Sequence, residues 1–412
     1  MGSVQKQVMD QTTDGASGRT LPQAWHLITS EYPPQHGGVS DYTQAVAAGL
    51  AGQGDEVHVW CPALATAGPV ETGVTVHRQF AGFSPLDLQL VGRQLDGFPA
   101  PRRILVQWVP HGYGYHSMNV PFCWWLWNRA RVHGDQIELM VHEPYLSFRL
   151  GSVRQSGAAT VHRLMASILL RAAHRVWISI PGWEPLLRPY ALGRKLPFQW
   201  LPIPSNVPIA AGANEVQMVR HRYAKDGQVL IGHFGTFGAL ITELLEPILS
   251  ALVRQPADQV VLLIGQRSQQ FRDELLRKDD RMAGFLQATG RLTSQELSHH
   301  LSACDLLIQP YPDGASTRRT SLMAGLSHGK PIVTTKGHLT EPFWSRTDAA
   351  VLVPAGNAPA FVECVTRLRE DAVQRKTMGS AARKLYRERF DICHTISVLR
   401  RPQMAEAPES AF

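Results

Sequence analysis

The sequence predicts an α/β protein with two domains, each built on a parallel sheet. Apolar runs of strand length alternate with helical patterns in both halves of the chain, which is typical of strand-helix-strand units. The segment FQWLPIPSNVPIAAGANEV at 198–216 separates the halves, and its prolines and small residues indicate a linker. At 412 residues the chain is long enough for two hydrophobic cores of ordinary size.

The predicted strands are short apolar runs that end in turn-forming residues. In the first half they lie at 24–30, 56–62, 104–110, 137–143 and 175–181. In the second half they lie at 228–235, 259–266, 306–312, 331–335 and 349–354. We therefore expect a disordered leader at 1–20, a first domain at 21–205 and a second domain at 206–387.

The composition narrows the class of protein. No apolar run is long enough to span a membrane and the first twenty residues lack an apolar signal core, so we expect a cytoplasmic protein. The cysteines are odd in number and scattered, which favours reduced thiols over disulfides or a zinc site: Cys61, Cys123, Cys304, Cys364 and Cys393. The formal net charge of +7 fits nucleic acid, a membrane surface or an anionic substrate. Basic residues are spread thinly, so we expect no nucleic-acid partner.

Ligands of open parallel sheets bind beyond the carboxyl ends of the strands, so the loops there carry the candidate residues. After the first strand, Gly37 and Gly38 precede a helix whose free N–H groups suit an anion, with Asp41 in its first turn. After the first strand of the second half, GHFGTFG at 232–238 offers a phosphate-facing loop with Gly235 and Thr236. An ordinary structural turn is the alternative for both loops.

Histidines and aromatic residues follow two strands of the first half. His142 and Glu143 end one strand, where a histidine can orient a hydroxyl or exchange a proton near neutral pH. His111 and Tyr113 follow another and are further pocket candidates. The aromatic run FCWWLWNRARV at 122–132 suits an acceptor ring or lipid, or else forms a buried helix face.

The segment PDGASTRRTSLMAGLSHGKPIVTT at 312–335 predicts a turn, a buried helix capped by Ser316 or Thr317, and a strand. Arg318 and Arg319 lie in the first turn of that helix, where the helix dipole opposes positive charge. An anion with two or more charges between the guanidinium groups resolves this conflict, and a diphosphate fits. The alternative is that the arginines pair with carboxylates.

The ordered set of these motifs resembles the GT-B glycosyltransferases, specifically glycosyltransferase family 4. The set comprises PPQ and GGVSDYT, VHEP, PIPSNVP, GHFGTFG, LLIGQRS, TGRLTSQELSHHLSACDLLIQPYPDG and HGKPIVTT, over residues 22 to 395. The resemblance implies two Rossmann-like domains facing across a cleft, with a C-terminal helix at about 388–402 that packs back on the first. It also implies retaining transfer from a nucleotide-diphosphate sugar, with no metal and no other cofactor, to a glycan, lipid or small-molecule acceptor. UDP, GDP, ADP and TDP are not distinguished, and a peripheral membrane contact stays open.

The resemblance also assigns residues to roles. It places His142 beside the reacting sugar, with Asp313 as the second candidate catalytic residue. It also places Gly38, Gly235 and Thr236 near the donor phosphates, and Gly290, Arg291 and Leu292 near the nucleotide base. With the candidates from the loops above, the predicted donor-binding residues are Gly37, Gly38, Gly235, Thr236, Arg267, Gly290, Arg291, Leu292, Ser316, Arg318, Arg319, Thr320 and Ser321. The predicted acceptor-binding residues are Asp41, His111, Tyr113 and Glu143.

One departure from the family pattern concerns its two glutamates, which face the donor sugar and the ribose. Aligning Gly329 and Pro331 with the family's glycine and proline puts Ser316 and Ala324 at those positions. A divergent branch, a sugar-nucleotide epimerase of the same fold, and a non-catalytic nucleotide-sugar-binding subunit therefore all stay open.

Overall fold

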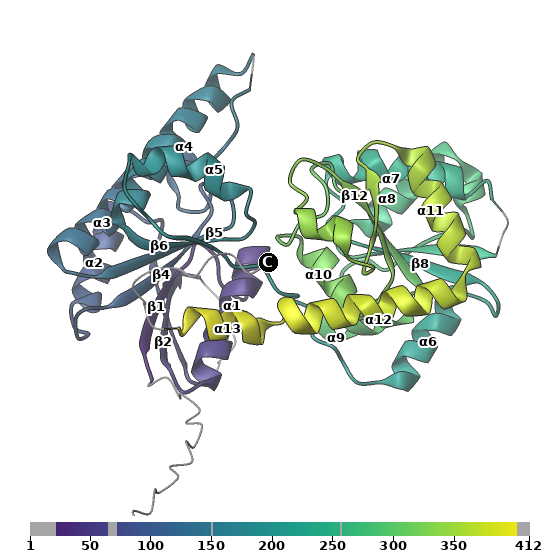
Figure 1. Cartoon of the computed structure of the whole chain (residues 1–412), viewed down its shortest axis with the longest axis horizontal. Helices are drawn as coiled ribbons and strands as arrows, with labels where there is room; N and C mark the ends of the chain where they lie inside the picture. Colours follow the sequence, from purple (N-terminus) through teal and green to yellow (C-terminus); the bar gives the residue numbers. More distant parts are fainter. Residues whose placement is uncertain (1–21, 65–71, 150, 256–257, 402–412) are drawn as a thin grey trace, which may run out of the picture.

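The computed structural model describes residues 22–64, 72–149, 151–255 and 258–401. The expected disordered leader at 1–20 lies outside these residues. Two α/β domains lie side by side, with the first domain in purple and blue and the second in green (Figure 1). The predicted fold class, two parallel-sheet α/β domains, is confirmed.

The first sheet has seven parallel strands in the order β3-β2-β1-β4-β5-β6-β7. Its strands are β1 (Ala24–Ile28), β2 (Glu56–Pro62), β3 (Val74–Phe80), β4 (Arg103–Trp108), β5 (Gln136–Val141), β6 (Ala173–Ile178) and β7 (Phe198–Trp200). Side chains alternate between the two faces of a strand, and in β1 Trp25 and Leu27 enter one apolar cluster while Ile28 enters the other. Both faces of the sheet are therefore buried, as all-parallel sheets require.

Helices cover both faces of this sheet. They are α1 (Gly38–Gly52), α2 (Pro85–Leu95), α3 (Val120–Val132), α4 (Val153–Ala172) and α5 (Trp183–Leu187), with short 3-10 turns at Tyr115–Ser117 and Arg188–Ala191. The aromatic run expected from the sequence forms α3. Its Phe122 and Leu126 are buried, whereas Trp124 is exposed, so α3 contributes both to the core and to the surface.

The second sheet has six parallel strands in the order β10-β9-β8-β11-β12-β13. Its strands are β8 (Val229–Phe234), β9 (Gln259–Ile264), β10 (Leu286–Ala288), β11 (Leu306–Gln309), β12 (Ile332–Lys336) and β13 (Val351–Pro354). Its helices are α6 (Ala213–Tyr223), α7 (Ala239–Leu252), α8 (Ser268–Lys278), α9 (Ser294–Ala303), α10 (Thr320–Ser327) and α11 (Ala358–Glu370), with 3-10 turns at Asp280–Met282 and Pro342–Arg346.

The last two helices, α12 (Ala372–Arg389) and α13 (Ile392–Leu399), run from the second domain to the first (Figure 1). Ile396 of α13 packs beside Gly49 of α1, where a Cβ atom would lie 2.6 Å from its side chain. Arg103 donates to the carbonyl oxygen of Leu399 at 2.8 Å, and Arg400 pairs with the buried Asp55 at 2.9 Å. The helix α13 and Arg400 are thus fastened to the first domain.

Candidate functional site

The loops at the carboxyl ends of the two sheets approach each other at the domain boundary. Arg318 Nη1 of the second domain lies 3.8 Å from Glu143 Oε1 of the first. Arg291 bonds to the ring of His36. Two predicted candidates, Glu143 of the first domain and Arg318 of the second, therefore meet across this boundary. Arg291 of the second domain contacts His36, a residue that the sequence analysis did not single out.

The two arginines at the start of α10 converge on one carboxylate. Arg318 donates to Asp313 Oδ2 and Arg319 donates to Asp313 Oδ1. Arg318 also lies over the ring of Trp183 at 5.6 Å, and Arg319 over that of Tyr311 at 4.8 Å. Asp313 lies between the guanidinium groups, at the position where the sequence predicts an anion.

The charges in this cluster do not balance within the second domain. Burial alone would raise the pKa of Asp313, but Arg319 and Arg318 hold that pKa below its ordinary value. One carboxylate of the second domain therefore faces two cations, and Glu143 of the first domain adds a carboxylate 3.8 Å from Arg318. The Nε atoms of both arginines are buried and have no hydrogen-bond partner among the described residues. The second domain's part of the cluster thus has unused donors and one more positive than negative charge, which Glu143 of the first domain offsets in part.

The rest of the α10 N-terminus differs from the expected cap. Arg319 is the N-cap residue and no side chain caps the helix, so the predicted cap by Ser316 or Thr317 is wrong. Ser321 Oγ in the first turn bonds to Tyr311 OH at 2.8 Å, which fixes both beside Thr320. Ser316 is fully buried and its hydroxyl has no partner among the described residues.

Ala324, at the position aligned with the second family glutamate, lies in the hydrophobic core of the second domain and is fully buried. A carboxylate at this position would enter the core.

Thr317 is instead the centre of a hydrogen-bond network that joins the two domains. Its Oγ1 lies 2.6 Å from Glu341 Oε1 and 2.9 Å from the carbonyl oxygen of Ser179 in the first domain. Trp200 Nε1 donates to the same Oγ1 at 3.2 Å. Because a hydroxyl has one proton, Thr317 can donate to only one of these two oxygens. Both contacts are hydrogen bonds if a protonated Glu341 donates to Thr317 Oγ1, which in turn donates to the carbonyl oxygen of Ser179. Burial raises the pKa of Glu341, although bonds from Thr317 and Trp344 oppose the rise, and so favours that protonated form.

The raised pKa of Glu341 predicts a stability change with pH. A carboxyl whose pKa is higher in the folded state stabilises the fold below its unfolded pKa, and this contribution is lost as pH rises through the folded pKa. We expect Glu341→Gln to be less stable than the parent at pH 4. Its side chain cannot ionise, and its NH₂ group would face the N–H group of Trp344, which is also a donor. The difference in unfolding free energy should then shrink as pH rises from 4 to 8, on the scale of about 1 kcal/mol. Urea denaturation at each pH measures it; a constant difference would contradict the assignment.

His142 in the first domain is half-buried at the end of β5. Its Nε2 lies 2.9 Å from Gln107 Oε1, and the ring stands edge-on to Tyr42 with centroids 5.1 Å apart. Burial lowers the pKa of His142 to about 3, so the ring is neutral near pH 7. A neutral imidazole has one N–H group, and here Nε2–H donates to Gln107 Oε1. Nδ1 is therefore the nitrogen through which His142 can accept a hydrogen bond from a substrate hydroxyl.

The predicted acceptor residues lie in different environments. Glu143 is about half exposed, and its Oε2 lies 3.7 Å from Nδ1 of the exposed His111. Asp41 accepts from Asn206 of the linker at 2.7 Å. Tyr113 is fully buried, stacked on Trp108, with its hydroxyl donated to the carbonyl oxygen of Gln107. Glu143 and His111 can therefore meet an acceptor directly, whereas Tyr113 belongs to the core.

The loop that contains Gly37 and Gly38 already holds an anion of its own. Glu31 Oε1 accepts from the backbone N–H groups of Val39 and Ser40, at 3.1 and 2.9 Å, in the first turn of α1. A Cβ atom on Gly37 would collide with the Glu31 carboxylate, so a larger residue here would push that carboxylate away from the N–H groups. A phosphate can use this helix N-terminus only by displacing Glu31.

In the second domain, Gly235 and Thr236 follow β8, and Thr236 is exposed. Beneath them, His233 Nδ1 lies 2.8 Å from the carbonyl oxygen of Ile308, to which it donates. Its Nε2 is buried without a partner among the described residues, 3.2 Å from where a Cβ atom on Gly235 would lie. Burial lowers the pKa of His233 to about 4, so this nitrogen is an unprotonated acceptor below the loop.

The loops after β9 and β10 are tied together. Gly290 N donates to Ser268 Oγ at 2.9 Å, and Gly290 has a φ of 73°, which favours glycine. Leu292 is half-buried beside them, whereas Arg267 and Arg291 are exposed. These residues form the rim of the second domain.

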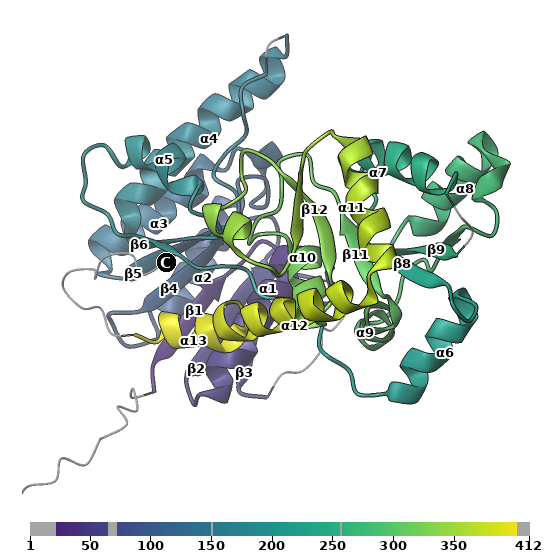
Figure 2. The same cartoon turned by 45° about the vertical axis from the view of Figure 1, so that its right-hand side comes forward.

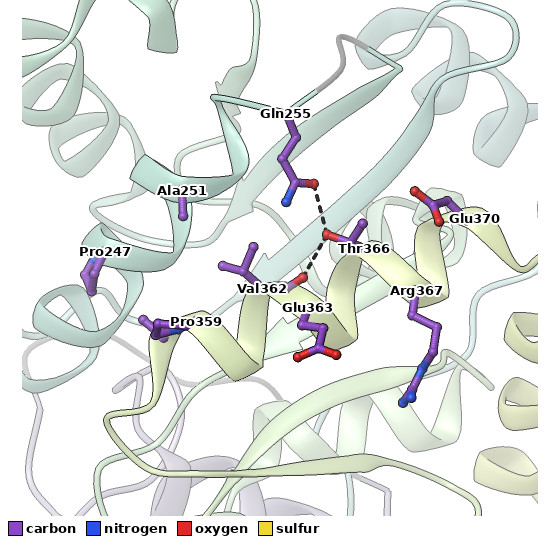
Figure 3. Close-up of a pocket in the computed structure, with 10 residues that line it drawn as sticks. Pro247, Ala251, Gln255, Pro359, Val362, Glu363, Thr366, Arg367 and Glu370 are labelled. Carbon is purple, nitrogen blue, oxygen red and sulfur yellow. Dashed lines mark hydrogen bonds between the residues drawn. The ribbon is translucent and has the colours of Figure 1, made fainter.

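Two surface hollows lie away from these residues. One of about 830 Å³ lies between α7 and α11, where Gln255 and Thr366 are hydrogen-bonded at 2.9 Å (Figure 3). The other, of about 820 Å³, lies between α2 and α3 and includes Trp124 and Trp125. Neither contains a predicted catalytic or donor-binding residue, but the second includes two tryptophans of the aromatic run that the sequence offered for an acceptor. Within the described ranges, no group of three or more histidine, cysteine, aspartate or glutamate residues is arranged to hold a metal ion.

Comparison with known proteins agrees with this arrangement. Residues 229–371 match the family model "Glycosyl transferases group 1", while no curated protein matches the chain. Sucrose-phosphate synthase from Thermosynechococcus elongatus is similar in structure, with a TM-score of 0.71 and 16% identity over 92% of this chain and 98% of that one. HepE from Anabaena, solved in complex with UDP and glucose, has a TM-score of 0.65 and 15% identity over 92% of this chain and 98% of its own. WaaG, a glycosyltransferase involved in lipopolysaccharide biosynthesis, has a TM-score of 0.62 and 13% identity over 92% of this chain and 98% of its own.

The resemblance expected from the sequence is therefore confirmed: the chain has the GT-B fold, and its second domain carries the group 1 glycosyltransferase signature.

Proposed function

We propose that this chain is a retaining, metal-independent glycosyltransferase that moves a sugar from a UDP-sugar to an acceptor hydroxyl. The observation that carries the proposal is the pair Arg318 and Arg319 at the amino end of α10, with more positive charge than Asp313 neutralises. A diphosphate supplies the missing negative charge. UDP is proposed because HepE, a structural neighbour, was solved with UDP bound.

In this mechanism the leaving diphosphate gathers negative charge as the bond to the anomeric carbon breaks. Arg318, Arg319 and the free N–H groups near Thr320 and Ser321 stabilise that charge, an effect worth several kcal/mol in a preorganised site. Asp313 gives up its place between the arginines when the diphosphate binds. Its displaced carboxylate then lies beside the donor, where it orients the sugar.

The acceptor approaches from the first domain. His142 accepts a hydrogen bond from a sugar hydroxyl through Nδ1, while Glu143 and His111 contact the acceptor. The acceptor hydroxyl attacks from the face that the diphosphate leaves, and its proton passes to a phosphate oxygen. The acceptor is a glycan, a lipid or a small molecule. We place the reaction in the cytoplasm, in keeping with five free cysteines.

The test is a calorimetric titration of the full chain with UDP, GDP, ADP and TDP at fixed salt with a chelator present. We expect UDP to bind most tightly, and incubation with UDP-sugars and candidate acceptors to release UDP. If none of the four nucleotides binds, the proposal fails.

The alternatives give different results in the same assays. A sugar-nucleotide epimerase changes the sugar of the donor without releasing UDP in the presence of any acceptor. A non-catalytic subunit, which Ser316 and Ala324 at the glutamate positions would suit, binds UDP-sugar without turnover.

A further inference from the structure

The segment between Glu143 and Glu184 contains no acidic residue. Over the same stretch the basic residues are the arginines at 149, 154, 163, 171 and 175. The segment comprises the loop after β5, the helix α4 and the strand β6. An anionic partner would therefore meet no carboxylate from this part of the chain.

The loop and the start of α4 also expose large apolar side chains. The exposed fractions are 57% for Phe148, 90% for Val153 and 52% for Leu164. Val153, Gly157, Thr160 and Leu164 are exposed at helical spacing, so they form one outer face of α4 that carries no charge. An outward helix face in a water-soluble domain ordinarily carries charged side chains.

This region projects from the body of the protein. The loop and the N-terminal end of α4 extend beyond every neighbouring element of the first domain in both views (Figures 1 and 2). Arg163 holds the loop against the helix: its guanidinium lies 3.9 Å from the ring of Phe148 and donates to the carbonyl oxygen of Leu146 at 3.0 Å. The tip, defined here as residues 146–149 and 151–154 with Leu164, is thus a held projection rather than the wall of a groove.

We propose that this tip binds the surface of a membrane that contains anionic lipids. Exposed apolar side chains flanked by Arg149 and Arg154 suit the boundary between acyl chains and headgroups, where apolar burial and attraction to anionic lipid act together. A convex tip of few residues suits lipid better than a folded protein, which needs a broad complementary surface of about 800 Å². In the described residues no helix is long and apolar enough to cross a membrane, so the contact is peripheral.

The tip is continuous with the proposed active site. His142 and Glu143 begin the loop that reaches Phe148. Resting on the proposed glycosyltransferase function, the tip selects a lipid-linked acceptor among the three acceptor classes, because membrane contact brings such an acceptor to His142.

The test is co-sedimentation of the full chain with vesicles of phosphatidylcholine alone or mixed with phosphatidylglycerol. We expect binding to the mixed vesicles and little to the neutral ones. Arg149→Glu with Arg154→Glu should weaken binding more than tenfold, since each arginine near an anionic surface contributes about fivefold. Phe148→Ser with Val153→Ser should also weaken it.

Matched controls change equally exposed residues elsewhere. Arg277→Glu with Lys376→Glu makes the same change in net charge, and Leu240→Ser with Val373→Ser removes two exposed apolar side chains. Both controls should bind vesicles like the parent. UDP titration of every variant reports on the nucleotide site separately. Failure of the membrane proposal, seen with vesicles, can therefore be distinguished from failure of the proposed glycosyltransferase function, seen with UDP.

Two results would overturn the proposal. One is the absence of binding to anionic vesicles by the parent chain. The other is equal weakening by the tip variants and their controls, which would reveal a general effect of net charge or apolar area. Self-association of the parent, abolished by the tip variants without vesicle binding, would assign the tip to a second copy of the chain instead.

Discussion

Replacing Arg318 and Arg319 together by alanine should remove most of the affinity for UDP. Each guanidinium would form charge-assisted hydrogen bonds with the diphosphate, and each such bond contributes about 1.5–3 kcal/mol. The dissociation constant of the double variant should therefore rise about 10²–10⁴-fold, and each single variant should lie between. Calorimetric titration with UDP at fixed salt measures this change.

Controls for this prediction come from the same cluster. The double variant leaves the part-buried Asp313 without either cation, so its unfolding must be compared with that of the triple variant that adds Asp313→Asn. Asp313→Asn alone should bind UDP at least as tightly as the parent, because the carboxylate that competes for the arginines is gone. Arg277→Ala on α8 serves as a distant control. Unchanged UDP affinity in the double variant would disprove the diphosphate assignment.

Much of the fold could be predicted from the sequence because buried parallel strands are continuous apolar runs. The runs at 24–30, 137–143 and 259–266 each contain a strand of the structure, β1, β5 and β9. Three strands were missed. β7 and β10 have only three residues each, and β3 is an edge strand, VTVHRQF, with mostly half-exposed side chains. Such segments bury little apolar surface, so their sequences do not contain the continuous apolar run by which a buried strand is recognised.

The candidate site was less predictable because its contacts join distant positions. The sequence placed Asp313 in a turn and Arg318 and Arg319 in the first turn of the helix that follows, and the three side chains do meet. Nothing local indicated that Thr317 would bond to Glu341 and Ser179 rather than cap α10. That choice depends on how the two domains pack.

Three further residues near the site escaped the sequence analysis. Glu31 lies six residues before Gly37, the glycine that approaches its carboxylate. The turn between the two residues was the only feature of the sequence that could have indicated this contact. Gln107, the partner of His142, is a buried amide within an apolar strand, and His233 lies inside the motif GHFGTFG. A polar residue inside an otherwise apolar strand was the available signal for both.

His142→Ala should lower kcat about 10²-fold and leave the UDP affinity unchanged, because Nδ1 contacts the sugar rather than the nucleotide in the proposed mechanism. Losing one preorganised hydrogen-bonding group in an active site has an effect of this size. Because burial lowers the pKa of His142 to about 3, its ring stays neutral from pH 5 to 8. The steady-state rate of the parent should therefore show no inflection near pH 6.5 that can be attributed to His142. Any inflection in that range should persist in His142→Ala.

His111→Ala is the matched control for this prediction. His111 is a histidine of the same first-domain edge but is exposed, and its Nδ1 lies 3.7 Å from Glu143 Oε2. Its removal should change kcat only a few-fold. Gln107→Leu separates positioning from contact: it frees Nε2 of His142, so kcat should fall by less than in His142→Ala while UDP binding stays intact. A pH profile with an inflection between 6 and 7 that His142→Ala abolishes would show that the ring ionises in the working enzyme, and a neutral acceptor at Nδ1 would then be the wrong role.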